Sequence, residues 1–264
     1  MNKVKMVSVI AISGCLSFSA LAKTPVNNIW KELYGTMSFQ LSETLQHLDN
    51  GKVHVECSLD NIAVVKRRYE TVIQTIMNNY VSGRKRCELA TTAQRIARDK
   101  PFNLEFKLKL SSKLSDSRQW FSAFQFHSNP DKGENWRCPI LALESVQGNF
   151  RMYNRWDENR ISTTKNGTCG NAGNSIQYRK LFEDLNYNAE DWIPVKISGV
   201  LSYSNPEACL SVSVGGVEMS YVCGLNTFND GKPVYAKFGI YKPTSWDTAE
   251  REITAEYKDI RFSQ

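Results

Sequence analysis

The stretch Pro233-Val-Tyr-Ala-Lys-Phe-Gly-Ile-Tyr-Lys242 decides the fold class of this 264-residue chain. Successive side chains of a β-strand point to opposite faces, so this pattern predicts one wholly apolar face and one polar face. The apolar face holds Val234, Ala236, Phe238 and Ile240. The polar face holds Tyr235, Lys237 and Tyr241, with Gly239 as a gap. We therefore expect a strand that packs on a core and lines a polar cleft.

A second stretch, Trp120-Phe-Ser-Ala-Phe-Gln-Phe-His127, repeats this arrangement. Unbroken alternation predicts Trp120, Phe124 and Phe126 on the buried face, with Gln125 and His127 on the other face. The two polar side chains would then lie about 7 Å apart, which is the rise of two residues along a strand. We interpret the two stretches as partner strands that each offer chemistry on one face only.

Short strands follow one another from about Gly83 to the end of the chain. Residues 102–110 alternate apolar with polar side chains, as in a half-buried antiparallel strand. Further strands are expected at 86–89, 140–145, 150–156, 193–203 and 253–262, and a hairpin at Val214-Gly-Gly-Val217. This spacing predicts an all-β fold, a concanavalin-like β-jelly roll of two antiparallel sheets.

The N-terminal part reads differently. Residues 59–80 have apolar side chains three or four positions apart, a spacing typical of a helix that packs on one side. These side chains are Ile62, Val65, Tyr69, Ile73 and Met77. We expect a helical N-terminal segment over residues 23–82 and a jelly-roll domain over residues 83–264.

Residues 1–22 have the features of a secretory signal peptide. Lys3 and Lys5 precede an apolar run that ends in Ala20-Leu-Ala22, and the run is too short to span a bilayer. An alternative is a lipoprotein cleavage box that ends in Cys15. Cleavage after Ala22 would lower the formal charge from +6 to +4. We expect a periplasmic or secreted monomer without membrane or nucleic-acid contacts, and this mild basic excess does not decide its function.

Cleavage after Ala22 leaves six cysteines, an even number that predicts three disulfides in an oxidising compartment. They are Cys57, Cys87, Cys138, Cys169, Cys209 and Cys223. Their connectivity is not readable from spacing. A two-residue turn at Gly215-Gly216 would put Cys209 and Cys223 on opposite faces, so a bond between them needs a bulge or another turn. No Cys-x-x-Cys pair or Cys/His cluster indicates zinc.

Three expected strands each offer a polar pair on one face: Arg86 with Glu88, Gln125 with His127, and Lys237 with Tyr241. Taken singly, each pair has an ordinary explanation, such as a salt bridge or a solvated strand face. Together, in this order, they resemble the motifs of a known family. The motifs are Arg86-x-Glu-Leu89, Gln125-x-His127 followed by Asn129-Pro-Asp131, and Tyr235-x-Lys-x-Gly-x-Tyr241.

The chain resembles polysaccharide lyases of the heparin lyase and glucuronan lyase type, and the related jelly-roll alginate lyases, from about Gly83 to the C-terminus. The resemblance implies β-elimination on a uronic-acid polymer, such as alginate, glucuronan or a glycosaminoglycan. It implies that Gln125 and Arg86 neutralise the sugar carboxylate. It further implies His127 as base or neutraliser, and Tyr241 as the acid and, for some sugar epimers, also the base.

Other residues are implied in binding this anionic polysaccharide, with Glu88 expected to hold Arg86. They are Lys237, Glu88, Asn129, Arg137 and Tyr235. Arg151 and Trp136 are further cleft candidates, and structural roles suit them and Arg137 equally well. No cofactor or catalytic metal is expected; structural calcium stays open, since no clustered acidic loop demands it. The alternatives are a non-catalytic carbohydrate-binding jelly roll and an envelope structural or adhesion domain.

Overall fold

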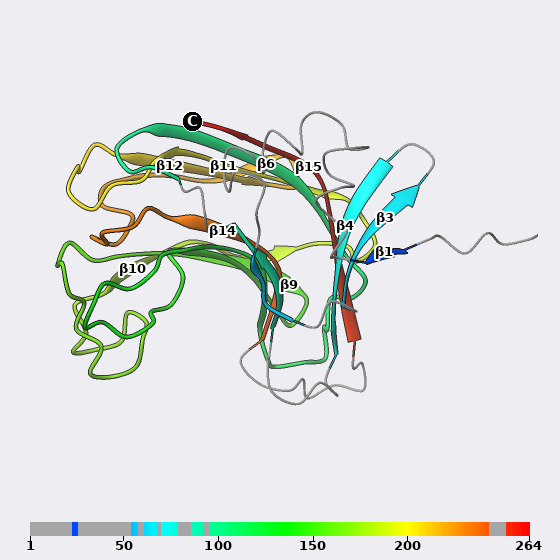
Figure 1. The fold of residues 1–264 in the computed structure, drawn as a ribbon, viewed down its shortest axis with the longest axis horizontal. Coiled ribbons are helices and arrows are strands. Elements are labelled where there is room, and N and C mark those ends of the chain that lie inside the picture. The colour runs from blue at the N-terminus through cyan, green and yellow to red at the C-terminus, as the bar shows by residue number, and fades with distance from the viewer. Residues whose placement is uncertain are drawn as a thin grey trace, which may run out of the picture.

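The computed structural model describes residues 23–25, 54–57, 61–67, 70–78, 86–91, 96–242 and 252–264. In these ranges the regular elements are all strands, in two antiparallel sheets that lie one over the other (Figure 1). One sheet has the order β1 (Lys23–Pro25), β3 (Ile62–Arg67), β4 (Glu70–Asn78), β15 (Glu252–Ser263), β6 (Pro101–Leu110), β11 (Ile193–Val200), β12 (Cys209–Val214) and β13 (Val217–Cys223). The other has the order β10 (Gln177–Asn186), β9 (Asn149–Trp156), β8 (Leu141–Val146), β7 (Phe121–His127), β14 (Tyr235–Tyr241), β5 (Arg86–Ala90) and β2 (His54–Val55). The predicted all-β jelly roll is confirmed.

The core lies between the facing sides of the two sheets. In β6, buried apolar and half-buried polar residues alternate without a break, as the sequence predicts. Phe106 of β6 meets Phe124 of β7 and Phe238 of β14, with ring centroids 4.8 and 5.4 Å apart. Because full burial of one such side chain contributes about 1.5–3 kcal/mol, these inner faces hold the sheets together.

The helix predicted for residues 59–80 is wrong. In the described part of that range, β3 and β4 form an antiparallel pair, with Val65 opposite Val72 and Ile62 opposite Thr75. More than half of the residues in these two strands are Ile, Val or Thr, whose branched side chains favour strands. The helical spacing arises because the range joins two strands, each with its own alternation. β4 is also paired with β15, and a sequence pattern does not reveal that partner.

Strand β7 contains a β-bulge. Ser122 pairs with Glu144 of β8 and Phe124 pairs with Leu143, so Ala123 is an extra residue between two successive pairs. A one-residue bulge reverses the alternation of inward and outward side chains along the strand. Before Ala123 the odd-numbered side chains point toward the core, and after Ala123 the even-numbered ones do.

The bulge puts Trp120 on the opposite face from the one predicted. Phe121 and Phe126 both belong to the core, whereas Trp120 lines a cleft on the other face of the sheet. The bulged residue Ala123 has a carbonyl oxygen that accepts a hydrogen bond from the Tyr257 hydroxyl of β15 at 2.5 Å. This bond joins the two sheets at the point where the strand pairing is irregular.

Strand β14 behaves as predicted on both faces. Ala236, Phe238 and Ile240 lie in the core, and Lys237 and Tyr241 line the cleft. Between the β7 pairs of Phe238 and Tyr241 the register shifts by one residue.

The three predicted disulfides are present, as Cys57–Cys87, Cys138–Cys169 and Cys209–Cys223. Cys209 and Cys223 lie directly opposite each other. A register shift between Val212 and Ser213 brings them to the same face of the hairpin, as the expected bulge would. The predicted signal peptide and the lipoprotein alternative at Cys15 lie outside the described residues. Among those residues, no helix is long and apolar enough to cross a membrane.

We expect Gly239→Ala to destabilise the protein by more than about 2 kcal/mol, because two costs add there. Its φ is +142°, and an added Cβ would collide with the Cys87 carbonyl oxygen and lie 2.5 Å from Glu88 Cα. Gly133→Ala is the matched control, since φ is +97° there and nothing lies within 4 Å of an added Cβ. Urea unfolding compares the two variants with wild type. An equal loss of unfolding free energy in both variants would show that the close approach of β14 to β5 at Gly239 does not matter for stability.

Candidate functional site

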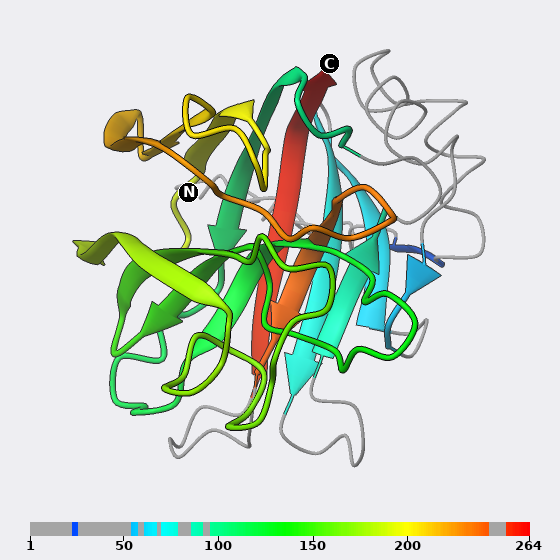
Figure 2. The same cartoon turned by 90° about the vertical axis from the view of Figure 1, so that its left-hand side faces the viewer.

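Strands β5, β14 and β7 are neighbours in the seven-stranded sheet and carry a cleft of about 450 Å³ on the face away from the core. Figure 2 shows this side of the molecule, with the green loops that follow β7 and β9 toward the viewer. All four side chains predicted to act in catalysis line the cleft: Arg86, Gln125, His127 and Tyr241. Tyr235, Lys237 and Arg137, predicted to bind substrate, line it too.

Strand register explains this convergence. His127 lies opposite Tyr235, and Gln125 lies opposite Lys237, so these four side chains share one face of the β7–β14 pair. On the other side of β14, Tyr241 lies opposite Arg86. The β14 strand is therefore the central element, because each predicted catalytic residue is on it or directly beside it.

The imidazole of His127 is half-buried between aromatic rings. It stacks on Tyr235 with ring centroids 5.8 Å apart and meets the edge of Trp136 at 5.7 Å. Its Nδ1 lies 2.9 Å from both the main-chain nitrogen and the main-chain oxygen of Ser128, so Nε2 is the nitrogen left for the cleft. Burial, followed by the charge of Lys237, lowers the pKa of His127 to about 3. The ring is therefore neutral at neutral pH.

The phenol ring of Tyr241 is held by two neighbours. The guanidinium carbon of Arg86 lies 4.6 Å from the centre of the ring, and Trp120 contacts it edge-on at 5.8 Å. Arg86 therefore makes a cation–π contact through the face of its guanidinium, and the N–H groups at its edge can donate hydrogen bonds. Arg86 belongs to β5 and Trp120 directly precedes β7, so the position of the phenol depends on the packed sheet.

Glu56, just after β2, is a cleft residue that sequence reasoning missed. Its carboxylate accepts hydrogen bonds from Arg86 at 2.8 Å and from Lys237 at 2.8 and 3.0 Å. Burial alone would raise the pKa of Glu56, but Lys237 and Arg86 together bring it below its usual value. The signal for this residue is the disulfide between Cys57 and Cys87, whose connectivity the spacing of cysteines does not reveal.

Lys237 is only 3% exposed, and its ammonium is directed at carboxylates. It lies 2.8 Å from Glu56 and 3.6 Å from Glu88. A buried cation needs such partners, because an unpaired charge in a low-dielectric environment is very costly. The predicted contact of Lys237 with substrate stays a prediction, and in the structure Lys237 donates to both carboxylate oxygens of Glu56.

Glu88 does not reach the cleft wall and is fully buried behind it. The amide nitrogen of Gln125 donates to Glu88 Oε1 and to Ser122 Oγ, both at 2.8 Å. Burial, the largest influence, raises the pKa of Glu88 to about 7 although Lys237 and Arg86 oppose the shift. The predicted contact of Glu88 with Arg86 exists as an ion pair of 3.7 Å.

A cluster of charged groups surrounds Arg137, which lines the cleft. Arg137 is buried and pairs with Glu134 and Asp230, while Arg160 pairs with Asp131. These bonds give Arg137 a structural role beside the binding role that the resemblance implies. Burial raises the pKa of Asp230, and Arg137 opposes that shift.

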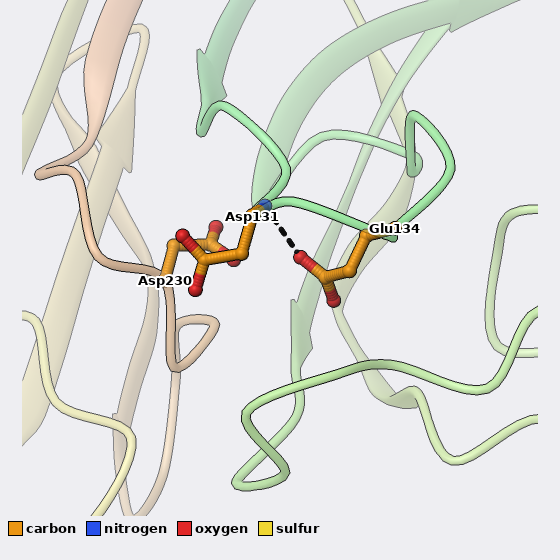
Figure 3. Close-up of side chains that lie close together, drawn as sticks. All are labelled: Asp131, Glu134 and Asp230. Atoms are coloured by element: carbon orange, nitrogen blue, oxygen red, sulfur yellow. Dashed lines mark hydrogen bonds between the residues drawn. The ribbon is translucent and has the colours of Figure 1, made fainter.

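The same cluster is the place where a structural calcium could be considered. Figure 3 shows Asp131, Glu134 and Asp230, whose carboxylates could in principle share an ion. Five of their six oxygens already accept hydrogen bonds from arginine or main-chain N–H groups. Calcium takes six to eight oxygen ligands, so these residues do not fit a calcium site.

The cleft continues from β7 over β8 and β9. Trp120, Glu144 and Arg155 line both the cleft and this extension, and Arg151 and Tyr178 line the extension alone. Alternation along β9 places Arg151 and Arg155 on one face, so this part could be read from the sequence. Asn129, predicted to bind substrate, is not among the residues that line either part.

Known proteins resemble this chain in sequence and in fold. The polysaccharide lyase family profile matches residues 42–256. An endo-β-1,4-glucuronan lyase from the fungus Trichoderma reesei superposes with a TM-score of 0.57 and 15% identity, over 81% of this chain and 87% of that one. An alginate lyase of polysaccharide lyase family 7 superposes more loosely, with a TM-score of 0.49 and 14% identity over 79% of this chain and 84% of that one. The first structure shares the fold. A search of curated protein sequences gives no match.

We expect Glu56→Ala to lower the free energy of unfolding by about 3 kcal/mol, because it removes the close partner of a buried ammonium. Urea unfolding with the disulfides intact measures this loss. Glu183→Ala is the matched control: it removes the partner of Lys180 in an ion pair whose side chains are both 44% exposed. That variant should unfold at the wild-type midpoint, since exposed pairs contribute little. A wild-type midpoint for Glu56→Ala as well would show that Lys237 does not depend on Glu56.

Proposed function

The chain belongs to the polysaccharide lyase family, and from this premise we propose that it cleaves a uronic-acid-containing polysaccharide by β-elimination. The product would carry a 4,5-unsaturated uronate end. Alginate, glucuronan and glycosaminoglycans are the candidate substrates. The observation that most supports the proposal is that a guanidinium, an amide, an imidazole and a phenol line one cleft. A lyase is an enzyme, so the non-catalytic binding module is set aside.

The reaction explains why these four groups are needed together. The C5 proton lies next to a carboxylate, and its removal adds negative charge to a group that is already anionic. Donors must neutralise that carboxylate, a base must take the C5 proton, and an acid must protonate O4 as the C4–O4 bond breaks. The electrons of the C5–H bond form the C4=C5 double bond, and no water is consumed.

In this proposal Arg86 and Gln125 neutralise the carboxylate. Arg86 uses one nitrogen for Glu56 and 36% of its side chain is exposed, so other N–H groups of its guanidinium remain for substrate. Loss of one directed donor of this kind typically costs about 3–4 kcal/mol of transition-state stabilisation. We therefore assign the largest electrostatic contribution to these two side chains.

We assign His127 as the base and Tyr241 as the acid. The imidazole of His127 is neutral at neutral pH, and its Nε2 faces the cleft with a lone pair when Nδ1 carries the hydrogen. For the epimer whose C5 proton lies on the other face of the ring, Tyr241 would take both roles. His127 would then donate to the carboxylate as a neutral imidazole. The sugar epimer thus decides which of the two side chains removes the proton.

We also propose that the enzyme works in the periplasm or outside the cell. The three disulfides support this, because such bonds persist in oxidising compartments. The anionic substrate follows from the proposed chemistry. A monomeric state and the absence of a cofactor stay predictions.

Purified oxidised protein should generate ultraviolet absorbance from at least one of alginate, glucuronan and a glycosaminoglycan. The chromophore is the new C4=C5 double bond, which is conjugated with the carboxylate. A panel of these three polymers, with a neutral glucan as control, identifies the substrate. Binding to a uronate polymer without any increase in absorbance would contradict the elimination.

His127→Ala and Tyr241→Phe should each abolish turnover and leave the thermal midpoint close to wild type, because both side chains lie at the cleft surface. Tyr221→Phe is the matched control, since Tyr221 is 65% exposed on β13 in the other sheet. His127→Asn separates the two roles of the imidazole, because an amide can donate to a carboxylate but cannot take the C5 proton. Retained turnover in that variant would make His127 a neutraliser and Tyr241 the base.

A further inference from the structure

The NH₂ group of Gln125 is held by neighbouring side chains, although its hydrogens are the ones proposed to serve the cleft. Its nitrogen carries two hydrogens, and these go to Glu88 Oε1 and Ser122 Oγ, each at 2.8 Å. The polar atom left for a ligand is then Oε1, which can only accept. An acceptor next to a uronate carboxylate is repulsive, so this orientation opposes the neutralising role.

Glu88 decides which end of the amide faces inward. The two ends of a glutamine amide have nearly the same shape, so their hydrogen-bond partners set the orientation. An ionised carboxylate only accepts hydrogen bonds and therefore holds the NH₂ end. A protonated carboxyl gains one O–H donor and keeps one acceptor oxygen, and it would hold the carbonyl end when the proton lies on Oε1, the oxygen that faces Gln125. The Ser122 hydroxyl can follow either arrangement, because it both donates and accepts.

We propose that Glu88 is a proton-controlled positioning residue for Gln125. With its proton on Oε1, Glu88 donates to Gln125 Oε1 and thereby turns both amide hydrogens toward the substrate carboxylate. Ionised Glu88 holds the NH₂ group and presents the carbonyl oxygen to the cleft. Glu88 acts through Gln125, since it lies behind the wall and does not touch the substrate. The inference rests on the proposed function, because it assumes a uronate carboxylate beside Gln125.

The groups around Glu88 set its pKa close to neutral pH. Among the described residues, the charged and titratable groups that face it are Arg86 on its own strand, Glu56 after β2, Lys237 on β14 and Tyr257 on β15. The two cations favour the ionised form, whereas complete burial and Glu56 favour the protonated form. The outcome is a pKa of about 7, so both orientations of Gln125 are accessible near neutral pH.

The pH dependence of kcat/KM tests the inference. For wild type we expect a fall of about 30-fold between pH 6 and pH 8.5, as one group with this pKa loses its proton. In Glu88→Gln the new amide cannot titrate, so kcat/KM should fall by less than about threefold between pH 6 and pH 8.5. His127, with its pKa of about 3, does not change over this range. Glu256→Gln, which replaces a buried glutamate on β15 outside the cleft, should keep the wild-type ratio.

Nuclear magnetic resonance supplies a readout that is independent of turnover. The side-chain N–H signals of Gln125, identified by their loss in Gln125→Ala, should shift with a single midpoint near pH 7 in wild type and stay constant in Glu88→Gln. Constant signals in wild type, or an unchanged fall of kcat/KM in Glu88→Gln, would overturn the inference. Titrating signals in a protein that cleaves no uronate polymer would support the switch while refuting the proposed function.

Discussion

The cleft depends on one irregularity in strand pairing, the extra residue at Ala123 of β7. Unbroken alternation would turn Phe121 toward the cleft and Trp120 toward the core. The bulge keeps the phenylalanines inside and places Trp120 and Ser122 on the side of Gln125. The main-chain carbonyl of Ala123 is buried, and a buried carbonyl without a hydrogen-bond partner is costly. The hydroxyl of Tyr257 satisfies that carbonyl from the other sheet, so the site and the sandwich stabilise each other.

Buried charge is the second constraint on the site. Lys237 lines the cleft and Glu88 lies behind it; both side chains are buried, and a buried charge without a partner is costly. Glu56 joins Lys237 and Arg86 from the edge of the sheet, and the disulfide at Cys57 holds it there. Glu56, which precedes the predicted jelly-roll domain, therefore completes the electrostatics of the cleft. The carboxylate of Glu56 raises the pKa of Glu88, so a residue that stabilises the fold also affects the protonation of a group beside the site.

Errors in reading the sequence occurred where tertiary pairing overrides a local pattern. Over residues 59–80 the helical spacing competed with a high content of branched residues, and pairing of β4 with β15 favours strands. β10 was not predicted at all. Two register shifts, between Lys180 and Phe182 and between Phe182 and Leu185, break its alternation. A bulged strand does not show the period of two on which such predictions depend.

Four features of this protein could be predicted from its sequence: the all-β class, the apolar and polar faces of β6 and β14, the number of disulfides and the polar residues that meet in the cleft. The first three follow from alternation and cysteine count, which are local properties, and the residues of the cleft follow from the motif resemblance. Tertiary structure alone decided the pairing of cysteines, the face of Trp120 and the arrival of Glu56 beside Lys237. It also decided the burial of Glu88, and with it a pKa of about 7. These features depend on residues far away in the chain. The partner strand sets which face a side chain takes after a bulge, and distant charges set the electrostatic potential at a buried carboxyl.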